Sequence, residues 1–261
     1  MEDIAAMRAA ETLLAEHKAN IRFKSLGPPE APATISDAYD IQEKYVGLLR
    51  SAHGEPAGYK VGLTSAAMQT FCGIDHPIAG VVLASRVHRS AVAVRRPDFG
   101  RLGLEFEIAV RIGSDVPVAG AAFNAETIAP HIDGVCAAIE LVDDRDADYG
   151  KLDGLSLVAD NSWNAGIVLS EFAGKWPDLG GVRGRATRDR ASIGEGHGRD
   201  ILGHPFNSVA WLASQLASRG IGLKTGEIVM TGSVIKTVFP TEEAHYRFDL
   251  DKIGFVEVQV R

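Results

Sequence analysis

Short runs of β-type composition follow one another from Gly58 to the end of this chain, and no other feature of the sequence constrains the fold as strongly. Glycine-rich turns, rather than regular helices, separate most of these runs. A doubly wound α/β sheet needs a helix between successive parallel strands, so the pattern disfavours that class. At least two helices interrupt the runs, one expected near residues 125–136 and one that begins at His204-Pro205 and ends at Gly220. We therefore predict an α+β protein with a β-rich core.

The N-terminal part of the chain has a helical pattern instead. Ile4, Met7 and Leu14 recur on one helical stripe, and charged residues occupy most other positions. After a proline-rich connector, a second helix is expected to have Ser36 as its N-cap and to stop at Gly54.

Composition and charge exclude several classes of protein. Hydrophobic residues make up 46% of the chain and charged residues 23%, which is ordinary for a globular protein. Acidic residues outnumber basic ones by 34 to 27, so no cationic excess is available for binding nucleic acid. No apolar run approaches the roughly 18–20 residues that span a membrane, and two cysteines, Cys72 and Cys136, suit a reducing cytosol. We expect a cytoplasmic protein whose helical segment over residues 1–55 and β-rich catalytic domain over residues 56–261 form one structural domain.

The segment 104–112 carries the clearest sign of chemistry. Its apolar residues alternate without a break, so they share one face of a strand, and Glu105 and Glu107 share the other face. These two glutamates are then about 6.6 Å apart along the strand. Two like charges on one strand face are tolerated at a solvent-exposed surface or around a cation, and the alternation alone leaves both interpretations open.

A third acid favours the cation. Glu140 stands among apolar residues in the run 136–142, and a glutamate is rarely buried without a partner. Three carboxylates, together with water and a substrate oxygen, suit a hard octahedral ion rather than zinc. Glu105, Glu107 and Glu140 therefore form a candidate site for Mg²⁺ or Mn²⁺.

One lysine and several polar residues at strand ends are further candidates. Lys60 lies in a glycine-flanked strand that runs into hydroxyl residues, among them Thr64. It suits a general base if burial and a nearby cation lower its pKa, whereas an ordinary surface lysine is the alternative. Asn161, Ser162 and Ser233 lie in two polar clusters that suit the binding of a substrate carboxylate, although turn formation explains them equally well.

Seven motifs in a fixed order resemble those of one known family. In chain order they are GYKVGLTSAAMQ at 58–69, a DxPxxG segment at 75–80, LEFEIAV at 104–110, IELVD at 139–143, DNSWNAGIVL at 160–169, LGHPFNSVAWLA at 202–213 and EIVMTGS at 227–233. In this combination the chain resembles the 2-oxopent-4-enoate (2-hydroxypenta-2,4-dienoate) hydratase group of the fumarylacetoacetate hydrolase superfamily. The 2-oxo-3-hexenedioate (4-oxalocrotonate) decarboxylases of that superfamily share these motifs.

The resemblance implies a fold, an assembly and a set of site residues. The fold is a β-rich mixed roll or sandwich with N-terminal helices, assembled as a homo-oligomer, alone or with another catabolic enzyme. Lys60 falls on the catalytic lysine, and Ser162 and Ser233 fall in segments that contact the substrate carboxylate. The residues that would hold Mg²⁺ or Mn²⁺ are Glu105, Glu107 and Glu140.

The reaction implied is that of a metal-dependent lyase on a small 2-oxo or 2-hydroxy-dienoic acid, such as hydration of 2-hydroxypenta-2,4-dienoate to 4-hydroxy-2-oxopentanoate. One residue departs from the hydratase pattern, because Ile78 stands where hydratases carry an acid that pairs with the lysine. The decarboxylases resemble this chain there, so decarboxylation of a 2-oxo-hexenedioate is the alternative. For hydration, Asp75 or His76 is the candidate proton carrier. A catalytically reduced subunit that binds a 2-oxo acid is the second alternative, and the complete glutamate set argues against it.

Overall fold

A computed structural model describes residues 1–118 and 122–261 of the chain. Within these residues, the two longest helices lie near the N-terminus and the last two strands end the chain. The helices are α1 Asp3–Lys18, α2 Ile35–His53, α3 Ala66–Phe71, α4 Ala125–Ile128, α5 Gly154–Ala159 and α6 Pro205–Ser218. The strands are β1 Pro56–Gly62, β2 Ile78–Leu83, β3 Val87–Arg89, β4 Val92–Val94, β5 Leu102–Ile112, β6 Ile132–Asp143, β7 Asn164–Leu169, β8 Arg183–Arg188, β9 Ala191–His197, β10 Ile228–Ser233, β11 Ala244–Leu250 and β12 Gly254–Val260.

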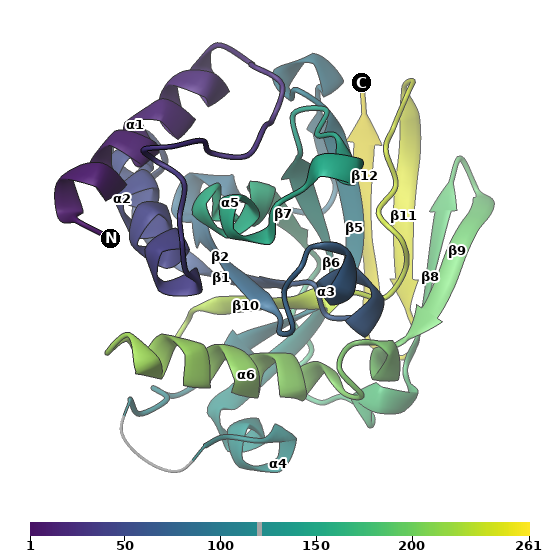
Figure 1. Cartoon of the computed structure of the whole chain (residues 1–261). Helices are drawn as coiled ribbons and strands as arrows, with labels where there is room; N and C mark the ends of the chain where they lie inside the picture. Colours follow the sequence, from purple (N-terminus) through teal and green to yellow (C-terminus); the bar gives the residue numbers. More distant parts are fainter. Residues whose placement is uncertain (119–121) are drawn as a thin grey trace.

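Two mixed sheets form the core of the molecule. The larger sheet has the strand order β2-β1-β10-β5-β6-β7-β3, and the smaller sheet has the order β4-β12-β11-β8-β9. Strands β11 and β12 pack against β6, and the rings of Phe106 and Phe248, 5.7 Å apart, fill part of the space between the sheets. Figure 1 shows the smaller sheet on one side of the molecule and the helices α1 and α2 on the other. The α+β architecture with N-terminal helices is therefore confirmed.

Strands β5 and β6 pair along almost their whole length at the centre of the larger sheet. The prediction of a helix over residues 125–136 is wrong in its second half, because α4 ends at Ile128 and β6 begins at Ile132. Val135 pairs with Val110 of β5, and this cross-strand pairing outweighs the helical pattern of the segment. The residues that precede Glu140 are thus part of strand β6, which lengthens its pairing with β5.

Helix α1 packs against α2 through its small residues, not through the stripe that the sequence predicted. Ile4 is 68% exposed and Met7 and Leu14 are only partly buried, so the stripe that they share is not the main contact face. Small side chains at the contact let the two helix backbones approach closely. The buried residues of α1 are Ala6, Ala9, Ala10 and Leu13.

Helix α2 begins two residues earlier than expected. Its N-cap is Thr34, whose hydroxyl accepts from the Asp37 N–H at 3.1 Å, whereas Ser36 lies inside the first turn. The helix ends at Gly54, where φ is 78°, as the sequence predicted. Within residues 1–118 and 122–261, no helix has both the length and the apolar character needed to cross a membrane.

Candidate metal and substrate site

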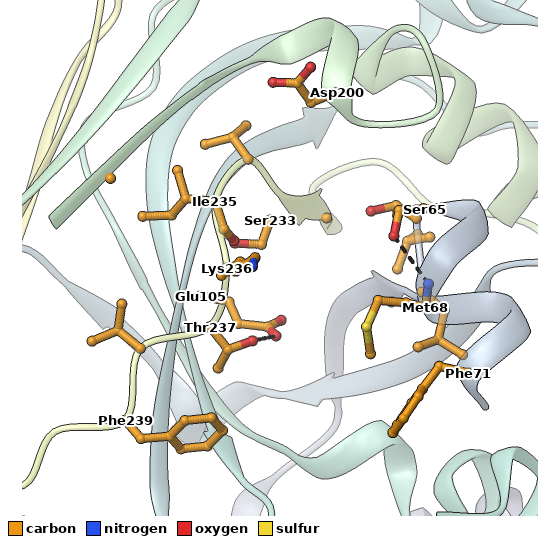
Figure 2. A pocket seen from close by; sticks show the side chains of 18 of the residues that line it. Ser65, Met68, Phe71, Glu105, Asp200, Ser233, Ile235, Lys236, Thr237 and Phe239 are labelled. Carbon is orange, nitrogen blue, oxygen red and sulfur yellow. Dashed lines mark hydrogen bonds between the residues drawn. The ribbon is translucent and has the colours of Figure 1, made fainter. Parts of the chain in front are cut away.

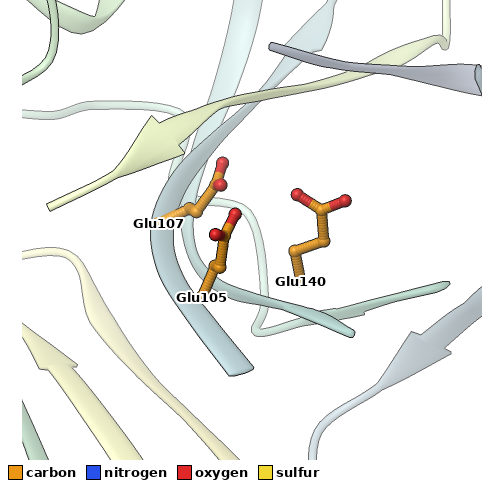
Figure 3. Close-up of side chains that lie close together, drawn as sticks. All are labelled: Glu105, Glu107 and Glu140. Carbon is orange, nitrogen blue, oxygen red and sulfur yellow. The ribbon is translucent and has the colours of Figure 1, made fainter. Parts of the chain in front are cut away.

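Three glutamates meet where β5 and β6 pair. Glu105 lies directly opposite Glu140 in the antiparallel register, and Glu107 lies two residues further along the same face of β5. One carboxylate oxygen from each lies within 4.8 Å of the other two (Figure 3). Glu107 and Glu140 have no exposed surface, so the interpretation of a solvent-facing strand is wrong. The arrangement that remains is a closed cluster of acids that needs a positive partner.

Neighbouring groups hold two of the carboxylates and leave one oxygen of each free. The Gly232 N–H donates to Glu107 Oε2 at 2.8 Å, and Asn164 Nδ2 donates to Glu140 Oε1 at 2.8 Å. Glu107 Oε1 and Glu140 Oε2 are buried and have no hydrogen-bond partner among the described residues. A buried carboxylate oxygen without a partner is costly, and a divalent cation with oxygen preference suits both of these oxygens. The residues present therefore fit a Mg²⁺ or Mn²⁺ ion.

The charges of the cluster act strongly on one another because Glu107 and Glu140 are fully buried and Glu105 is partly buried. Burial, followed by the charges of Glu140 and Glu105, raises the pKa of Glu107 well above its ordinary value. Burial also raises the pKa of Glu140 to about 7, against the lowering effect of Lys60. Ionised carboxylates at neutral pH therefore cost folding free energy here, and a bound cation would offset that cost.

Lys60 reaches this cluster from β1, which is separated from β5 by β10. The residue is 4% exposed, and its Nζ lies 3.4 Å from Glu140 Oε1. The alternative of a surface lysine is therefore wrong. Burial acts to lower the pKa of Lys60, but the three carboxylates outweigh burial and raise it.

Two glycines make room for the lysine. A side chain on Gly62 would lie 3.3 Å from Lys60 Nζ and 3.4 Å from Ile78 Cγ1. A side chain on Gly80 would lie 2.7 Å from the carbonyl oxygen of Asn161 and 3.1 Å from Lys60 Cγ. The glycine-flanked pattern around Lys60 thus has a steric cause, and Ile78 and the lysine head lie over the same glycine.

An open cleft of about 890 Å³ reaches the cluster at one of its members, Glu105 (Figure 2). Glu105 lies among its lining residues, next to Thr237 in the figure. Met68 and Phe71 of α3 line one side, and Phe239, from the segment that follows β10, lines another. The approach to the glutamates is therefore bordered largely by apolar side chains.

A smaller cavity of about 90 Å³ lies beyond Glu105, which lines both spaces. Lys60, Ile78 and Ser162 line this inner cavity. Glu105 therefore lies between the open cleft and the cavity that holds the lysine.

Ser233 and Thr64, two of the predicted substrate-binding residues, line the open cleft. The Ser233 hydroxyl already accepts from the Phe106 N–H at 3.0 Å, which ties it to β5. Thr64 packs against Gly232, where φ is 113° and an added Cβ would lie 2.5 Å from Thr64 Cγ2. Both hydroxyl residues lie near the glutamates, because Gly232 itself holds Glu107.

Asn161 and Ser162 lie in a tight turn, Asn161–Trp163, whose three residues have φ of 50°, 50° and 59°. Each such non-glycine residue costs about 1–3 kcal/mol, so other contacts must hold the turn. The Asn161 side chain accepts from the Val81 N–H at 2.7 Å and donates to its carbonyl at 2.9 Å. Ser162 Oγ donates to the Ala79 carbonyl at 3.2 Å. Asn161 is thus engaged by β2, whereas Ser162 also faces the inner cavity.

The structure does not bring the two candidate proton carriers to the lysine. Asp75 is exposed, and His76 Nδ1 lies 2.7 Å from the carbonyl oxygen of Pro77 while its ring stacks on Trp211. Asp75 and His76 are both absent from the described residues that line the cleft and the inner cavity.

The sequence did not predict that Asn164, Gly232 and Thr237 hold the glutamates. Asn164 and Gly232 lie in two of the sequence motifs, and the only local sign of their role is an amide or a glycine at the end of a strand. Thr237 Oγ1 donates to Glu105 Oε1 at 2.6 Å. No local pattern marks Thr237, because its segment lies outside the named strands and meets β5 at the isolated bridge between Leu104 and Val238.

Comparisons with known proteins by sequence and by structure both include 4-oxalocrotonate decarboxylases. The family model described as "Fumarylacetoacetate (FAA) hydrolase C-terminal" matches residues 62–261. The "2-keto-4-pentenoate hydratase" of Paraburkholderia phymatum is 32% identical over 87% of this chain and 86% of its own length. The "4-oxalocrotonate decarboxylase" of a Pseudomonas species is 29% identical over 86% of this chain and 87% of its own length.

A solved structure matches the whole chain. It is the "4-oxalocrotonate decarboxylase from Pseudomonas putida G7", complexed with magnesium and adipate, with a TM-score of 0.89 at 25% identity. The match covers 100% of this chain and 99% of that one. Relatives with two different reactions are thus similar to this chain over most of its length.

Proposed function

This chain belongs to the fumarylacetoacetate hydrolase family, and from that premise we propose that it is a divalent-metal-dependent lyase of hydratase type. Its substrate would be 2-hydroxypenta-2,4-dienoate or a similar 2-oxo or 2-hydroxy-dienoic acid, converted to a 4-hydroxy-2-oxo acid. The similarity to several proteins named as hydratases of such acids supports this substrate class.

One observation carries the proposal. Two buried carboxylate oxygens without partners among the described residues belong to a cluster that meets a buried lysine, and the third acid of the cluster, Glu105, lines an open cleft. Glu105, Glu107 and Glu140 would hold Mg²⁺ or Mn²⁺, since these ions prefer anionic oxygen ligands. When bound, the cation supplies a fixed positive charge for the oxygens of a 2-oxo acid.

The residues of the chain then have distinct tasks. The glutamates set the charge and position of the ion and need not exchange protons. Lys60 Nζ is the ionisable group nearest Glu140 in the inner cavity, so it is the candidate for moving a proton to or from the substrate. Met68 and Phe71 present apolar surface to the cleft, which limits the water around the reacting atoms.

Hydroxyl groups around the two spaces would bind the substrate carboxylate. Ser233 and Thr64 line the cleft, and Ser162 lines the inner cavity. Asn161 would act indirectly, since its side chain is occupied by β2 and fixes the turn that carries Ser162.

A screen of purified protein tests the function. The protein would be supplied with Mg²⁺ and a panel of 2-hydroxydienoates and 2-oxo-hexenedioates, followed by ultraviolet absorbance and carbon dioxide release. We expect loss of dienoate absorbance without carbon dioxide, abolished by chelator and restored by Mg²⁺ or Mn²⁺. Full activity in chelator would contradict the metal site. Absence of any turnover with metal would contradict the lyase and favour the catalytically reduced subunit.

Ile78 favours a second candidate, decarboxylation of 2-oxo-3-hexenedioate. Its side chain lies over Gly62 beside the lysine head and cannot accept a proton or orient a water. An apolar wall does no harm to the loss of carbon dioxide, and the similar structure with TM-score 0.89 is a decarboxylase. Release of carbon dioxide without hydration in the same screen would select this candidate.

The assembly and the compartment belong to the same proposal. We expect a homo-oligomer in the cytoplasm, alone or with another catabolic enzyme, as the family resemblance implies. The two cysteines are free and buried, which suits a reducing compartment. Light scattering coupled to gel filtration would measure the oligomer.

A further inference from the structure

A second cluster of buried charge adjoins the Asn161–Trp163 turn. Arg145 is 1% exposed, and its Nη2 donates to Asp160 Oδ2 at 2.7 Å. His17 Nε2 lies 2.6 Å from the other oxygen, Asp160 Oδ1. Asp160 directly precedes the turn, so these two contacts hold the point where the turn begins.

The N-terminal segment completes this cluster. Arg145 Nη1 donates to the Ile21 carbonyl at 2.9 Å, and the guanidinium carbon lies 5.6 Å from the centre of the Phe23 ring. The Phe23 ring meets Trp163, the last residue of the turn, edge to face with centroids 5.0 Å apart. The segment that follows α1 therefore contacts the end of the turn directly through aromatic packing and is joined to its beginning through Arg145.

The Asn161–Trp163 turn is also connected directly to the glutamate site. Asn164 follows Trp163 directly, and its amide donates to Glu140 at 2.8 Å. The carbonyl oxygen of Asn161 lies close to Gly80, since a Cβ added to that glycine would be 2.7 Å from the oxygen. The side-chain stem of Lys60 lies against the same glycine. Three consecutive residues of positive φ do not keep this shape without outside contacts. A shift of the turn therefore moves the group that orients Glu140.

We propose that Arg145 and Asp160 are positioning residues: their ion pair fixes the turn to the N-terminal segment and thereby sets the orientation of Asn164 and the Glu140 carboxylate. The inference rests on the proposed function in taking Glu140 as a metal ligand. An ion pair with a merely structural role would change stability alone. A positioning pair also changes the metal affinity of the folded protein.

Mn²⁺ binding to the full chain distinguishes these roles. Arg145→Met removes the charge and keeps most of the stem, and Asp160→Asn keeps the shape of the carboxylate. Each variant is expected to raise the Mn²⁺ dissociation constant about 10–100-fold, the usual effect of losing a partner that orients a ligand. Arg145→Lys retains the cation and should recover part of this loss. Titrations are made well below the unfolding temperature of each variant.

Arg247→Met is the matched control, since it removes an arginine that pairs with Asp249 at 2.6 Å in the smaller sheet. It should bind Mn²⁺ as the wild type does. A folded Arg145→Met protein whose dissociation constant is within twofold of this control would overturn the inference. If Arg145→Met does not fold, the same criterion applies to Asp160→Asn. Wild-type protein that does not bind Mn²⁺ would overturn the proposed function and the inference with it.

Discussion

Glu107 has a combination of properties that does not serve stability. It has no exposed surface, and its Oε1 has no partner among the described residues. Burial and the charges of Glu140 and Glu105 raise its pKa well above the ordinary value. A group that costs folding free energy in this way is expected where a function requires it.

We predict that Glu107→Gln weakens Mn²⁺ binding at least about 100-fold and abolishes divalent-dependent activity. Losing a partner of a ligand costs about 10–100-fold in affinity, and losing the ligand's own charge should cost at least as much. Calorimetric titration measures the affinity, and circular dichroism checks that the fold is unchanged. Glu195→Gln, at an exposed glutamate that lines the outer cleft and pairs with Arg183, is the control and should bind the ion normally. Equal affinities for the two variants would contradict the site.

Lys60 is the residue for which proton transfer is predicted. Lys60→Met keeps the volume of the stem and removes only the ionisable head, so kcat should fall about 10²–10⁴-fold, the usual loss for an acid–base group. Lys236→Met serves as the control, because Lys236 lines the outer cleft and is exposed. Steady-state rates on a 2-hydroxydienoate are the measurement. A Lys60→Met rate within a few-fold of the control would remove Lys60 from the mechanism.

Ile78 decides between the two reactions. It is buried beside the lysine head, and Asp75 and His76 are absent from the described residues that line the cleft and the inner cavity. Ile78→Asp would place a carboxylate next to Lys60, and we expect hydration of a 2-hydroxydienoate to rise or stay the same. The variant is compared with Ile78→Ala, which opens the same space without adding an acid. Slower hydration by Ile78→Asp than by Ile78→Ala would refute the expectation.

Among the helices and strands, local sequence patterns predicted the elements whose apolar residues recur at regular spacing. The alternation of β5 is visible in the sequence because successive side chains of a strand point to opposite faces, and β5 keeps this regular form where it pairs with β6 from Leu102 to Arg111. That its glutamate face is buried was not visible, since Lys60 comes from β1 and Asn164 from β7, far away in the chain. The alanine face of α1 was also missed, because apolar periodicity weighs large side chains, whereas a close helix contact needs small ones.

The start of α2 allows the N-cap seen in the structure, Thr34, to be tested against the one predicted from the sequence, Ser36. Thr34 accepts from the Asp37 N–H, and the Asp37 carboxylate accepts from the Thr34 N–H at 3.0 Å, so the helix carries a reciprocal cap. Thr34→Ala should lower the free energy of unfolding by about 1 kcal/mol, or about 2–4 °C in unfolding temperature for a chain of this size. Ser36→Ala removes the N-cap that the sequence suggested and should change stability little. A larger loss from Ser36→Ala than from Thr34→Ala, measured by thermal denaturation, would show that the cap is misplaced.

Across the molecule, the site joins strands that are distant in the sequence. Its groups come from β1, β5, β6, β7 and the segment that follows β10, so only the completed larger sheet brings them together. The order of the motifs identified most of these segments. The residue spacing inside a single motif, however, does not show which carboxylate oxygens lack a hydrogen-bond partner in the folded chain. The sheet that assembles the cluster also buries Glu107 and Glu140, which links metal binding to the stability of the whole fold.

Metal-free protein is therefore expected to lose stability as pH rises. The folded-state pKa values of Glu107 and Glu140 lie above the ordinary 4.5, that of Glu140 at about 7. Between pH 4.5 and these raised values the folded state holds more protons than the unfolded state, so stability falls across this range. In chelator, the unfolding temperature of the wild type should decrease from about pH 5 to about pH 7.5, more steeply than that of Glu107→Gln.

Saturating Mg²⁺ should reverse this trend, because the ion binds the ionised carboxylates and compensates their burial. At a free concentration about 100 times the dissociation constant, a ligand that binds only the folded state adds about 2.7 kcal/mol. Thermal denaturation at both pH values, with chelator and with Mg²⁺, gives the four unfolding temperatures needed, and Glu107→Gln should show little response to the ion. If the wild type in chelator follows the same pH dependence as Glu107→Gln, the carboxylates ionise without cost in the fold, and a cation is not what the cluster requires.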